Sequence, residues 1–308
     1  MELARKTHAR AARWLLAGML ACGAAAAVAQ ESPTLRKIEA TGVITLGYRD
    51  NSPPFSYLDD RQRPIGYTMD LCRRIVGAVK RRLKLPDLQV KLTPVYSATR
   101  IPMVANHTVD LECGTTTNNV ERQKQVAFTV TTFVAASRLV SKRESQIRVL
   151  GDLRGKTVVS TAGATSLALL VDLNATRGLE MNILTGKDNV QSFYMVQSDR
   201  AAAFAMDDVL LYGLLATVND PASFVVTAEP LSVEPYGIGL RKGDAEFKKL
   251  ADDTLIALFK TGEIHVIYRK WFESTIPPQQ INLRRPMSTA LANAIARPTD
   301  SGDPADYR

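Results

Sequence analysis

Short apolar runs alternate with amphipathic stretches along most of the chain, and this alternation predicts buried strands separated by surface helices. Residues 43–48 form an apolar run of strand length, whereas residues 67–83 place apolar side chains at helical spacing. The other elements expected in the first half are strands at 88–92 and 109–112 and a short helix at 99–105. Strands that alternate with helices favour βαβ units and a sheet covered on both faces, so the expected fold class is α/β.

The same alternation starts again in the second half of the chain. Its expected strands are residues 156–160, 182–184, 201–205 and 224–226, and its expected helices are 166–173, 208–215, 245–260 and 263–272. Two extended runs, residues 131–141 and 234–240, connect the halves in this interpretation. Two α/β lobes joined by two extended crossings leave a cleft between them, and ligands of open α/β sheets lie at the carboxyl ends of the strands.

The first 29 residues have the parts of a secretory signal peptide. Four basic residues precede an apolar run at residues 14–21, and alanines lead to a cleavage site of the A-x-A type, Ala27-Val28-Ala29. The apolar run is too short to span a membrane stably. We therefore expect an exported, periplasmic protein that is cleaved near Ala29, with lipidation of Cys22 as an open alternative.

The net charge does not predict nucleic-acid binding. The whole chain has a formal charge of +8, but four basic residues and one acidic residue lie in the expected leader, which leaves about +5. No basic stripe interleaved with aromatic residues accompanies this surplus. A mild positive charge is instead compatible with small acidic ligands.

Two cysteines remain after the expected leader, and their number and compartment favour a disulfide. Cys72 lies on the apolar side of its expected helix, and Cys113 follows an expected strand. Two cysteines in an oxidising compartment are more often paired than free, so we expect a bridge from helix to sheet. Two separate buried thiols stay open as an alternative, because the sequence does not give the Cα separation.

A turn rich in hydroxyl groups follows the expected strand at residues 109–112. The run D-L-E-C-G-T-T-T-N-N-V-E-R brings three threonines and two asparagines to the start of a short helix and ends on Arg122. Hydroxyl groups and free N–H groups at a helix start can hold an anion, and a guanidinium can bind a carboxylate through two bonds. The alternative is an N-capped helix with a solvated arginine.

The sequence gives little support for catalysis. The histidines after the leader are His107 and His265, and neither has partners at the spacing of a metal site or a catalytic triad. Nucleophile-elbow, phosphate-loop and C-x-x-C motifs are absent from the sequence. We expect a protein that is not an enzyme and needs no cofactor or metal. An exported enzyme acting on a carboxylate substrate is the alternative, with Glu112 or Asp207 as its acid or base.

Four runs of the sequence resemble a known family. They are G-T-T-T-N-N-V-E-R-Q-K-Q at residues 114–125, S-A-T-R-I-P at 97–102, P-P-F-S-Y at 53–57 and A-M-D-D-V-L-L at 205–211. They resemble the periplasmic solute-binding proteins, family 3, and in particular the glutamate/aspartate-binding components of ABC importers. The resemblance covers roughly residues 35–272. It implies a two-lobed periplasmic-binding-protein fold of type II, a monomer, an amino-acid ligand, and a membrane permease as partner.

The expected organisation follows from the crossings and the resemblance. Residues 30–132 and 238–276 make up the first lobe, and residues 133–237 make up the second lobe. Residues 277–308 form a C-terminal extension, with one more helix at 287–296 and a tail rich in Pro, Asp and Ser that we expect to be partly disordered.

The resemblance also implies a set of ligand-binding residues. The side-chain carboxylate of the ligand would be held by Arg49, Ser97 and Arg100, and its α-carboxylate by Arg122, Thr115, Thr117 and the helix start at Thr165. Asp207 would hold the α-ammonium. Asn189 stands where relatives usually have a histidine that helps to hold the side-chain carboxylate. An asparagine can donate a hydrogen bond but carries no charge, so the ligand could also be another polar amino acid.

The residue types fit a dicarboxylic amino acid on physical grounds as well. Such a ligand carries two carboxylates and one ammonium, so its site needs two cationic clamps and one anion. Each of these residues also has a simpler role: Arg49 could be a surface charge, Arg100 a solvated helix residue, and Asp207 an N-cap. Because no histidine remains in the expected set, we expect selectivity for the dicarboxylic ligand to vary little between about pH 6 and 8.

Overall fold

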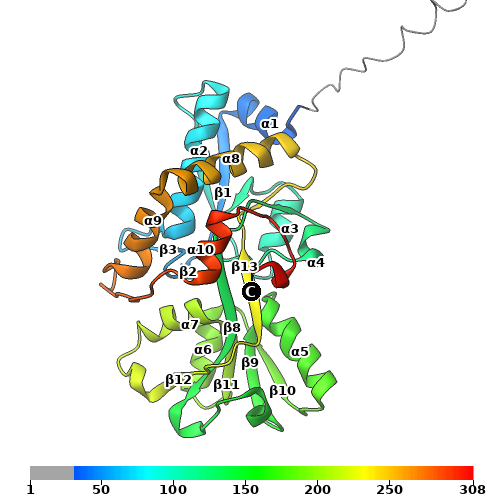
Figure 1. Cartoon of the computed structure of the whole chain (residues 1–308), viewed down its shortest axis with the longest axis vertical. Helices are drawn as coiled ribbons and strands as arrows, with labels where there is room; N and C mark the ends of the chain where they lie inside the picture. The colour runs from blue at the N-terminus through cyan, green and yellow to red at the C-terminus, as the bar shows by residue number, and fades with distance from the viewer. Residues whose placement is uncertain (1–30, 308) are drawn as a thin grey trace, which may run out of the picture. The chain divides into compact units, whose positions relative to one another are not determined.

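The computed structural model describes residues 31–307, and within them the chain folds into two α/β lobes (Figure 1). The expected fold class is confirmed. The expected signal peptide and Cys22 lie outside the described residues. No helix among residues 31–307 is both long enough and apolar enough to cross a membrane.

The first lobe is built on a mixed sheet of five strands. In spatial order these strands are β5 (Gln89–Pro94), β1 (Val43–Tyr48), β6 (Leu111–Glu112), β14 (Gly239–Leu240) and β7 (Ala127–Phe128). Strand β1 is parallel to both β5 and β6, whereas β14 is antiparallel to β6 and β7. The carboxyl ends of the three parallel strands therefore meet at one edge of the sheet, where ligands of α/β sheets bind.

The second lobe has a mixed sheet of six strands. Its strands are β10 (Asn182–Gly186), β9 (Thr157–Thr161), β11 (Ala203–Asp207), β8 (Phe133–Lys142) and β12 (Phe224–Val226), with β13 (Ser232–Tyr236) also paired to β8. Strands β10, β9 and β11 are parallel, and β8 is antiparallel to β11.

Helices cover both sheets. Those of the first lobe and the C-terminal region are α1 (Pro33–Thr41), α2 (Tyr67–Leu83), α3 (Arg100–Ala105), α4 (Val120–Gln123), α8 (Ala245–Thr261), α9 (Glu263–Tyr268) and α10 (Thr289–Ala296). Those of the second lobe are α5 (Thr165–Arg177), α6 (Asn189–Gln197) and α7 (Asp208–Leu215). Helix α2 shows the packing that its sequence pattern predicts, because Leu71, Ile75 and Val79 are fully buried. Basic side chains fill its last turn, where they interact favourably with the partial negative charge of the helix C-terminus.

The chain crosses between the sheets twice. It leaves the first sheet after β7 and enters β8, and it returns from β13 to β14. Figure 1 shows β8 and β13 side by side between the two groups of elements. The Thr132 N–H donates to the carbonyl of Tyr236 at 2.9 Å, and the Thr129 N–H donates to that of Ile238 at 3.0 Å. The two crossings are thus hydrogen-bonded to each other over their length.

An aromatic cluster packs at the start of the first crossing. The ring centroid of Phe133 lies 4.9 Å from that of Phe55 and 5.2 Å from that of Phe272. Tyr67 joins the cluster, and its hydroxyl donates to the carbonyl of Thr132 at 2.8 Å. These rings are part of the hydrophobic core, and they anchor the first crossing to the first lobe.

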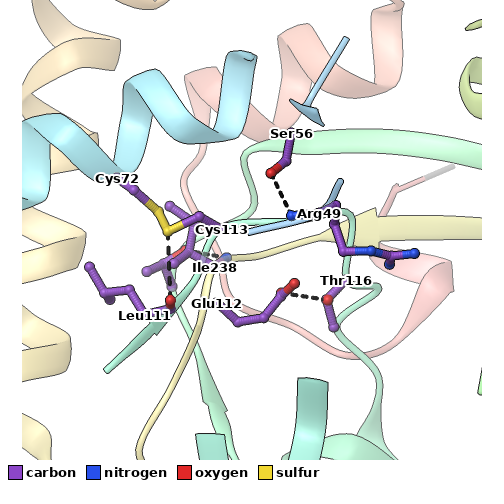
Figure 2. The surroundings of a disulfide bond; sticks show 9 residues. Arg49, Ser56, Cys72, Leu111, Glu112, Cys113, Thr116 and Ile238 are labelled. Carbon is purple, nitrogen blue, oxygen red and sulfur yellow. Dashed lines mark hydrogen bonds between the residues drawn. A yellow bond between two sulfur atoms is a disulfide. The ribbon is translucent and has the colours of Figure 1, made fainter. Parts of the chain in front are cut away.

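The expected disulfide is confirmed. Cys72 on α2 and Cys113 after β6 are bonded through their sulfur atoms, with their Cα atoms 6.2 Å apart (Figure 2). Both residues are completely buried. Figure 2 also shows Glu112, Thr116 and Arg49 close to the bridge. The disulfide therefore fixes α2 to the strand end from which the threonine-rich turn begins.

Candidate functional site

The first group of predicted site residues lies at the carboxyl ends of β1, β5 and β6. Arg49 follows β1 and Ser97 follows β5, and they meet because the two strands are parallel neighbours. The Arg49 Nη1 donates to the Ser97 Oγ at 3.1 Å. Arg49 is only 4% exposed, so the alternative of a solvated surface charge is excluded.

Arg100 is the first residue of α3 and is also buried, at 3% exposure. Its Nη1 donates to the carbonyl of Thr115 at 2.7 Å, while its Nε has no hydrogen-bond partner among residues 31–307. Burial, and then the neighbouring charge of Arg100, lower the pKa of Arg49 to about 10, and Glu112 partly offsets this shift. Two buried guanidinium groups are thus held near each other, and their positive charges favour binding of an anion.

The threonine-rich turn places Arg122 between the lobes. The Asn119 side chain accepts a hydrogen bond from the Arg122 N–H at 2.9 Å and caps α4. The Arg122 Nη1 donates to the carbonyl of Thr117 at 2.9 Å, and its Nη2 donates to the carbonyl of Gly163 at 3.1 Å. Burial, and then Arg100, lower the pKa of Arg122 to about 10. This arginine is held by both lobes and is not a freely solvated side chain.

The second lobe presents helix starts and a strand end to the first lobe. Thr165 opens α5, and its Oγ1 lies 3.5 Å from the Oγ1 of Thr117 across the lobes. Asn189 opens α6 and is buried, and its Oδ1 accepts a hydrogen bond from the Thr161 Oγ1 at 2.8 Å. The neighbouring Asp188 affects the pKa of Arg49, which places this helix start near the Arg49 end of the site.

Asp207 ends β11 and has one free carboxylate oxygen. It is 4% exposed, and its Oδ2 accepts a hydrogen bond from the Tyr236 hydroxyl. Its Oδ1 is buried and has no partner among the described residues. Asp207 stands at the N-cap position of α7, but its side chain makes no capping bond. An unpaired buried oxygen is costly unless a donor reaches it, so the Asp207 Oδ1 is a candidate acceptor for a donor group of a ligand.

The structure adds Glu234 and Tyr236 to the expected ligand-binding residues, and it shows the contact of Glu112, which was expected only as the acid or base of an enzyme. Glu234 on β13 is buried, and its Oε2 accepts a hydrogen bond from the Thr165 Oγ1 at 2.8 Å. Tyr236, two residues later, holds Asp207. Glu112 accepts a hydrogen bond from the Thr116 Oγ1 at 2.5 Å (Figure 2). The E-P-Y run of the second crossing carried a signal for two of them, since polar residues alternate there on a strand that faces the site.

The environment of Asp207 raises its pKa from the acidic range to near neutral pH. Burial, and then the carboxylate of Glu234, raise the pKa of Asp207 to about 8. A group of the site therefore titrates near neutral pH even though no histidine is present. The sequence does not reveal this titrating group, because Glu234 and Asp207 act on each other only through their positions in space.

This raised pKa predicts that a ligand ammonium displaces a proton from the site. The ammonium favours the ionised carboxylate, so binding below about pH 8 requires Asp207 to lose its proton. Affinity should then rise from pH 6 towards pH 8 by at most about tenfold per pH unit, and level off above the pKa of the empty site. Calorimetry in two buffers of different ionisation enthalpy at pH 7 should show up to one proton released.

The ratio of glutamate to glutamine affinity should stay nearly constant over this range, because both ligands carry the same ammonium. Binding without proton release at pH 7 would show that Asp207 is already ionised or does not contact the ligand.

The two lobes touch closely beside the site. Gly163 has a φ of +77°, and a Cβ atom there would lie 2.6 Å from the Cα of Ala98. Glycine is therefore required both for the left-handed backbone and for the approach of the two lobes. On the same side, the Lys187 Nζ lies 5.1 Å from the ring centroid of Tyr96.

A separate cavity of about 460 Å³ lies beside the site. Its lining includes Asp50 and Val190, the chain neighbours of Arg49 and Asn189, together with Pro277 and Pro278. None of the nine predicted ligand-binding residues lines it. In residues 31–307 there is also no cluster of three His, Cys, Asp or Glu side chains that could hold a metal ion.

The arrangement can bind a small molecule with two anionic groups and one cationic group. Three guanidinium groups gather around the facing ends of the two sheets, and the pKa of Arg122 depends on both Arg100 and Asp207. The carboxylate of Asp207 supplies the matching negative charge, with an oxygen free to accept.

Comparisons with known proteins agree with this geometry. A sequence profile described as bacterial extracellular solute-binding proteins, family 3, matches residues 44–274. The L-glutamate/L-aspartate-binding protein of Pseudomonas aeruginosa is 52% identical over 268 residues, which are 87% of this chain and 89% of that protein. The glutamate/aspartate import solute-binding protein of Escherichia coli is 44% identical over 300 residues, 97% of this chain and 99% of that protein.

Among solved structures, a mutant of ArgBP from T. maritima matches with a TM-score of 0.69 and 25% identity, over 78% of this chain and 100% of that one. The fold is that of the type II periplasmic amino-acid-binding proteins, as the resemblance implied. The relatives above are named as binding proteins, in agreement with the expectation that the chain is not an enzyme. From the family profile and these identities, the chain belongs to the bacterial extracellular solute-binding proteins, family 3.

Proposed function

We propose that this protein is the substrate-binding component of an ABC importer and that it binds an acidic amino acid, glutamate or aspartate. One observation supports this ligand class above all: the buried side chains of Arg49, Arg100 and Asp207 converge with Arg122, and Asp207 keeps an unpaired oxygen. The relatives named as glutamate/aspartate-binding proteins support the same ligand.

The α-amino and α-carboxylate groups of the ligand lie at the Arg122 end of the site. Arg122 binds the α-carboxylate together with Thr115, Thr117 and the start of α5 at Thr165, where free N–H groups and the helix dipole favour an anion. The free Oδ1 of Asp207 accepts from the α-ammonium. These groups are common to all α-amino acids, so this end supplies affinity but little selectivity.

The side-chain carboxylate lies at the other end, against Arg49, Ser97 and Arg100. The unpartnered Nε of Arg100 offers a donor, and Asn189 offers its amide from the second lobe. Charge-assisted hydrogen bonds contribute about 1.5–3 kcal/mol each. Five or six of them, after the costs of ordering and desolvation, are compatible with a micromolar or lower Kd, near −8 kcal/mol or below.

The cellular setting follows from the same proposal. The chain is exported into the periplasm after cleavage near Ala29, acts as a monomer without nucleic acid, and delivers its ligand to a membrane permease. Its lobes comprise residues 30–132 with 238–276, and residues 133–237, with the extension at 277–308. The changes of sheet after β7 and β13 support these boundaries.

Closure of the two lobes on the ligand tests this proposal. The ligand contacts both lobes and should therefore favour the arrangement in which Arg122 reaches Gly163. Small-angle scattering of ligand-stripped protein should give a smaller radius of gyration after saturation with glutamate. D-glutamate serves as a control, because its ammonium and carboxylate cannot reach Asp207 and Arg122 together with the side-chain clamp. An unchanged radius at saturating L-glutamate would contradict closure.

A further inference from the structure

The C-terminal segment 299–307 returns to the first crossing between the lobes. Figure 1 shows this red segment beside β13, and the Thr131 N–H donates to the carbonyl of Thr299 at 2.8 Å. The hydroxyl of Tyr307 lies 2.7 Å from the Oγ1 of Thr131 and donates to the carbonyl of Ser301 at 2.9 Å. This packing differs from the partial disorder expected of a tail rich in Pro, Asp and Ser, because its polar groups find partners on the crossing.

The same segment also holds the turn that carries Arg122. The carbonyl of Asp300 accepts hydrogen bonds from the Asn118 Nδ2 at 2.7 Å and from the Gln123 Nε2 at 2.9 Å. Gln123 also donates to the Asn118 Oδ1 at 2.8 Å, which closes a small network. One backbone carbonyl of the tail thus binds both ends of the segment that contains Arg122.

Two further contacts fix the tail in place. The Asp300 carboxylate pairs with the Lys248 Nζ at 3.0 Å. Tyr307 is 4% exposed and packs in an apolar cluster with Val134 and Ala294. The tail is therefore anchored on α8, on β8 and on α10.

Helix α4 needs such a support. It has only four residues, and a helix of this length is not stable without outside contacts. Gly302 lies so close to it that a Cβ atom would be 2.9 Å from the backbone C of Asn119 and the backbone N of Val120. Asn119 is the residue whose side chain caps the Arg122 N–H, so a shift there moves Arg122 directly.

We propose that residues 299–307 are a brace that positions Arg122 and the threonine-rich turn for the α-carboxylate of the ligand. These residues do not touch the ligand, and they act through Asn118, Asn119 and Gln123. The proposal rests on the proposed function for the role of Arg122. It predicts that loss of the brace weakens every α-amino-acid ligand by the same factor and leaves the ratio of glutamate to glutamine affinity unchanged.

The test uses Gly302→Ala, whose methyl group would force the tail away from the turn, and the exposed Asp306→Ala in the same segment as its matched control. Titration calorimetry should show glutamate, aspartate and glutamine each weakened by about 5- to 30-fold in Gly302→Ala, as for the loss of one or two hydrogen bonds. Asp306→Ala should bind within about twofold of wild type, the usual range for a surface substitution.

Hydrogen exchange separates positioning from general stability. In ligand-free Gly302→Ala, amides of residues 115–125 should exchange faster than in wild type, while those of β9 and β11 should not change. A second variant that ends at Pro298 should show the same pattern more strongly.

Three outcomes would overturn the brace, and a fourth would contradict the proposed function instead. Wild-type affinity in Gly302→Ala and in the shortened variant, or a lower melting temperature without weaker binding, would overturn the brace. A changed ratio of glutamate to glutamine affinity would overturn it too. Failure of wild type to bind any amino acid would instead contradict the proposed function.

Discussion

Replacement of Arg122 by alanine is expected to weaken the binding of every α-amino acid that this protein binds, by about 2–5 kcal/mol. That loss corresponds to an increase in Kd of roughly 30-fold to several-thousand-fold. The reason is that the α-carboxylate would be taken out of water without its guanidinium partner. Two carbonyl groups, those of Thr117 and Gly163, would also lose their donor. Isothermal titration of the ligand-stripped variant measures the effect.

A matched control lies two residues further along the chain. Lys124→Ala removes the same charge from an exposed surface pair with Glu121, which contributes little. This variant should bind as wild type does. Normal binding by a folded Arg122→Ala, with circular dichroism unchanged, would show that the α-carboxylate lies elsewhere.

Replacement of Arg49 by glutamine should have a different signature. Arg49 is buried against Ser97 at the end where we place the side-chain carboxylate. Glutamate should lose about 2–5 kcal/mol of binding free energy, because its charge would face a neutral amide. Glutamine brings no charge to this end and should lose much less, so the preference for glutamate should shrink or disappear.

Arg49→Gln and Arg122→Ala serve as controls for each other, because they should change the affinities in different ways. One changes the ratio of glutamate to glutamine affinity, and the other lowers both affinities together. The variants need a melting curve first, since loss of Arg49 removes one of the positive charges that act on the buried Glu112. Equal losses of glutamate and glutamine in Arg49→Gln would place Arg49 outside the selective end of the site.

Much of the fold could be predicted because the sequence pattern and the packing agree. Strands β1 and β12 and helices α2 and α7 lie at the predicted residues. The strands are short runs of strand length, α2 has its apolar residues on one face, and α7 is a longer, almost wholly apolar run. Helix α6 was missed because N-V-Q-S-F-Y-M-V-Q does not separate apolar from polar positions cleanly. The small sheet of β2 (Asn51–Ser52), β3 (Ser56–Leu58) and β4 (Pro64–Ile65) was not predicted either, because strands of two or three residues in a proline-rich segment show no alternating pattern.

The site could be predicted where its residues follow neighbouring strands, and not where they meet only in space. Arg49 and Ser97 come together because β1 and β5 are parallel neighbours. The contact of Tyr236 with Asp207 depends instead on the order of strands in the second sheet. Strand β13, which carries Tyr236, pairs with β8, and β8 pairs with β11, which ends at Asp207. The raised pKa of Asp207 follows from that arrangement, so no local sequence pattern predicts it. The docking of Asp300 on Asn118 joins residues 182 positions apart and is equally invisible in the sequence.

The most direct test of the proposed ligand class is a titration of ligand-stripped wild-type protein with glutamate, aspartate and glutamine. We predict that at least one of the two acidic amino acids binds with a Kd in the micromolar range or below, and at least tenfold more tightly than glutamine. An amide brings no charge to offset the two buried guanidinium groups of Arg49 and Arg100, which should account for a difference of about 1.4 kcal/mol or more. Glutamine binding as tightly as glutamate would contradict an acidic amino acid as the ligand and would indicate a binder of another polar amino acid on the same fold.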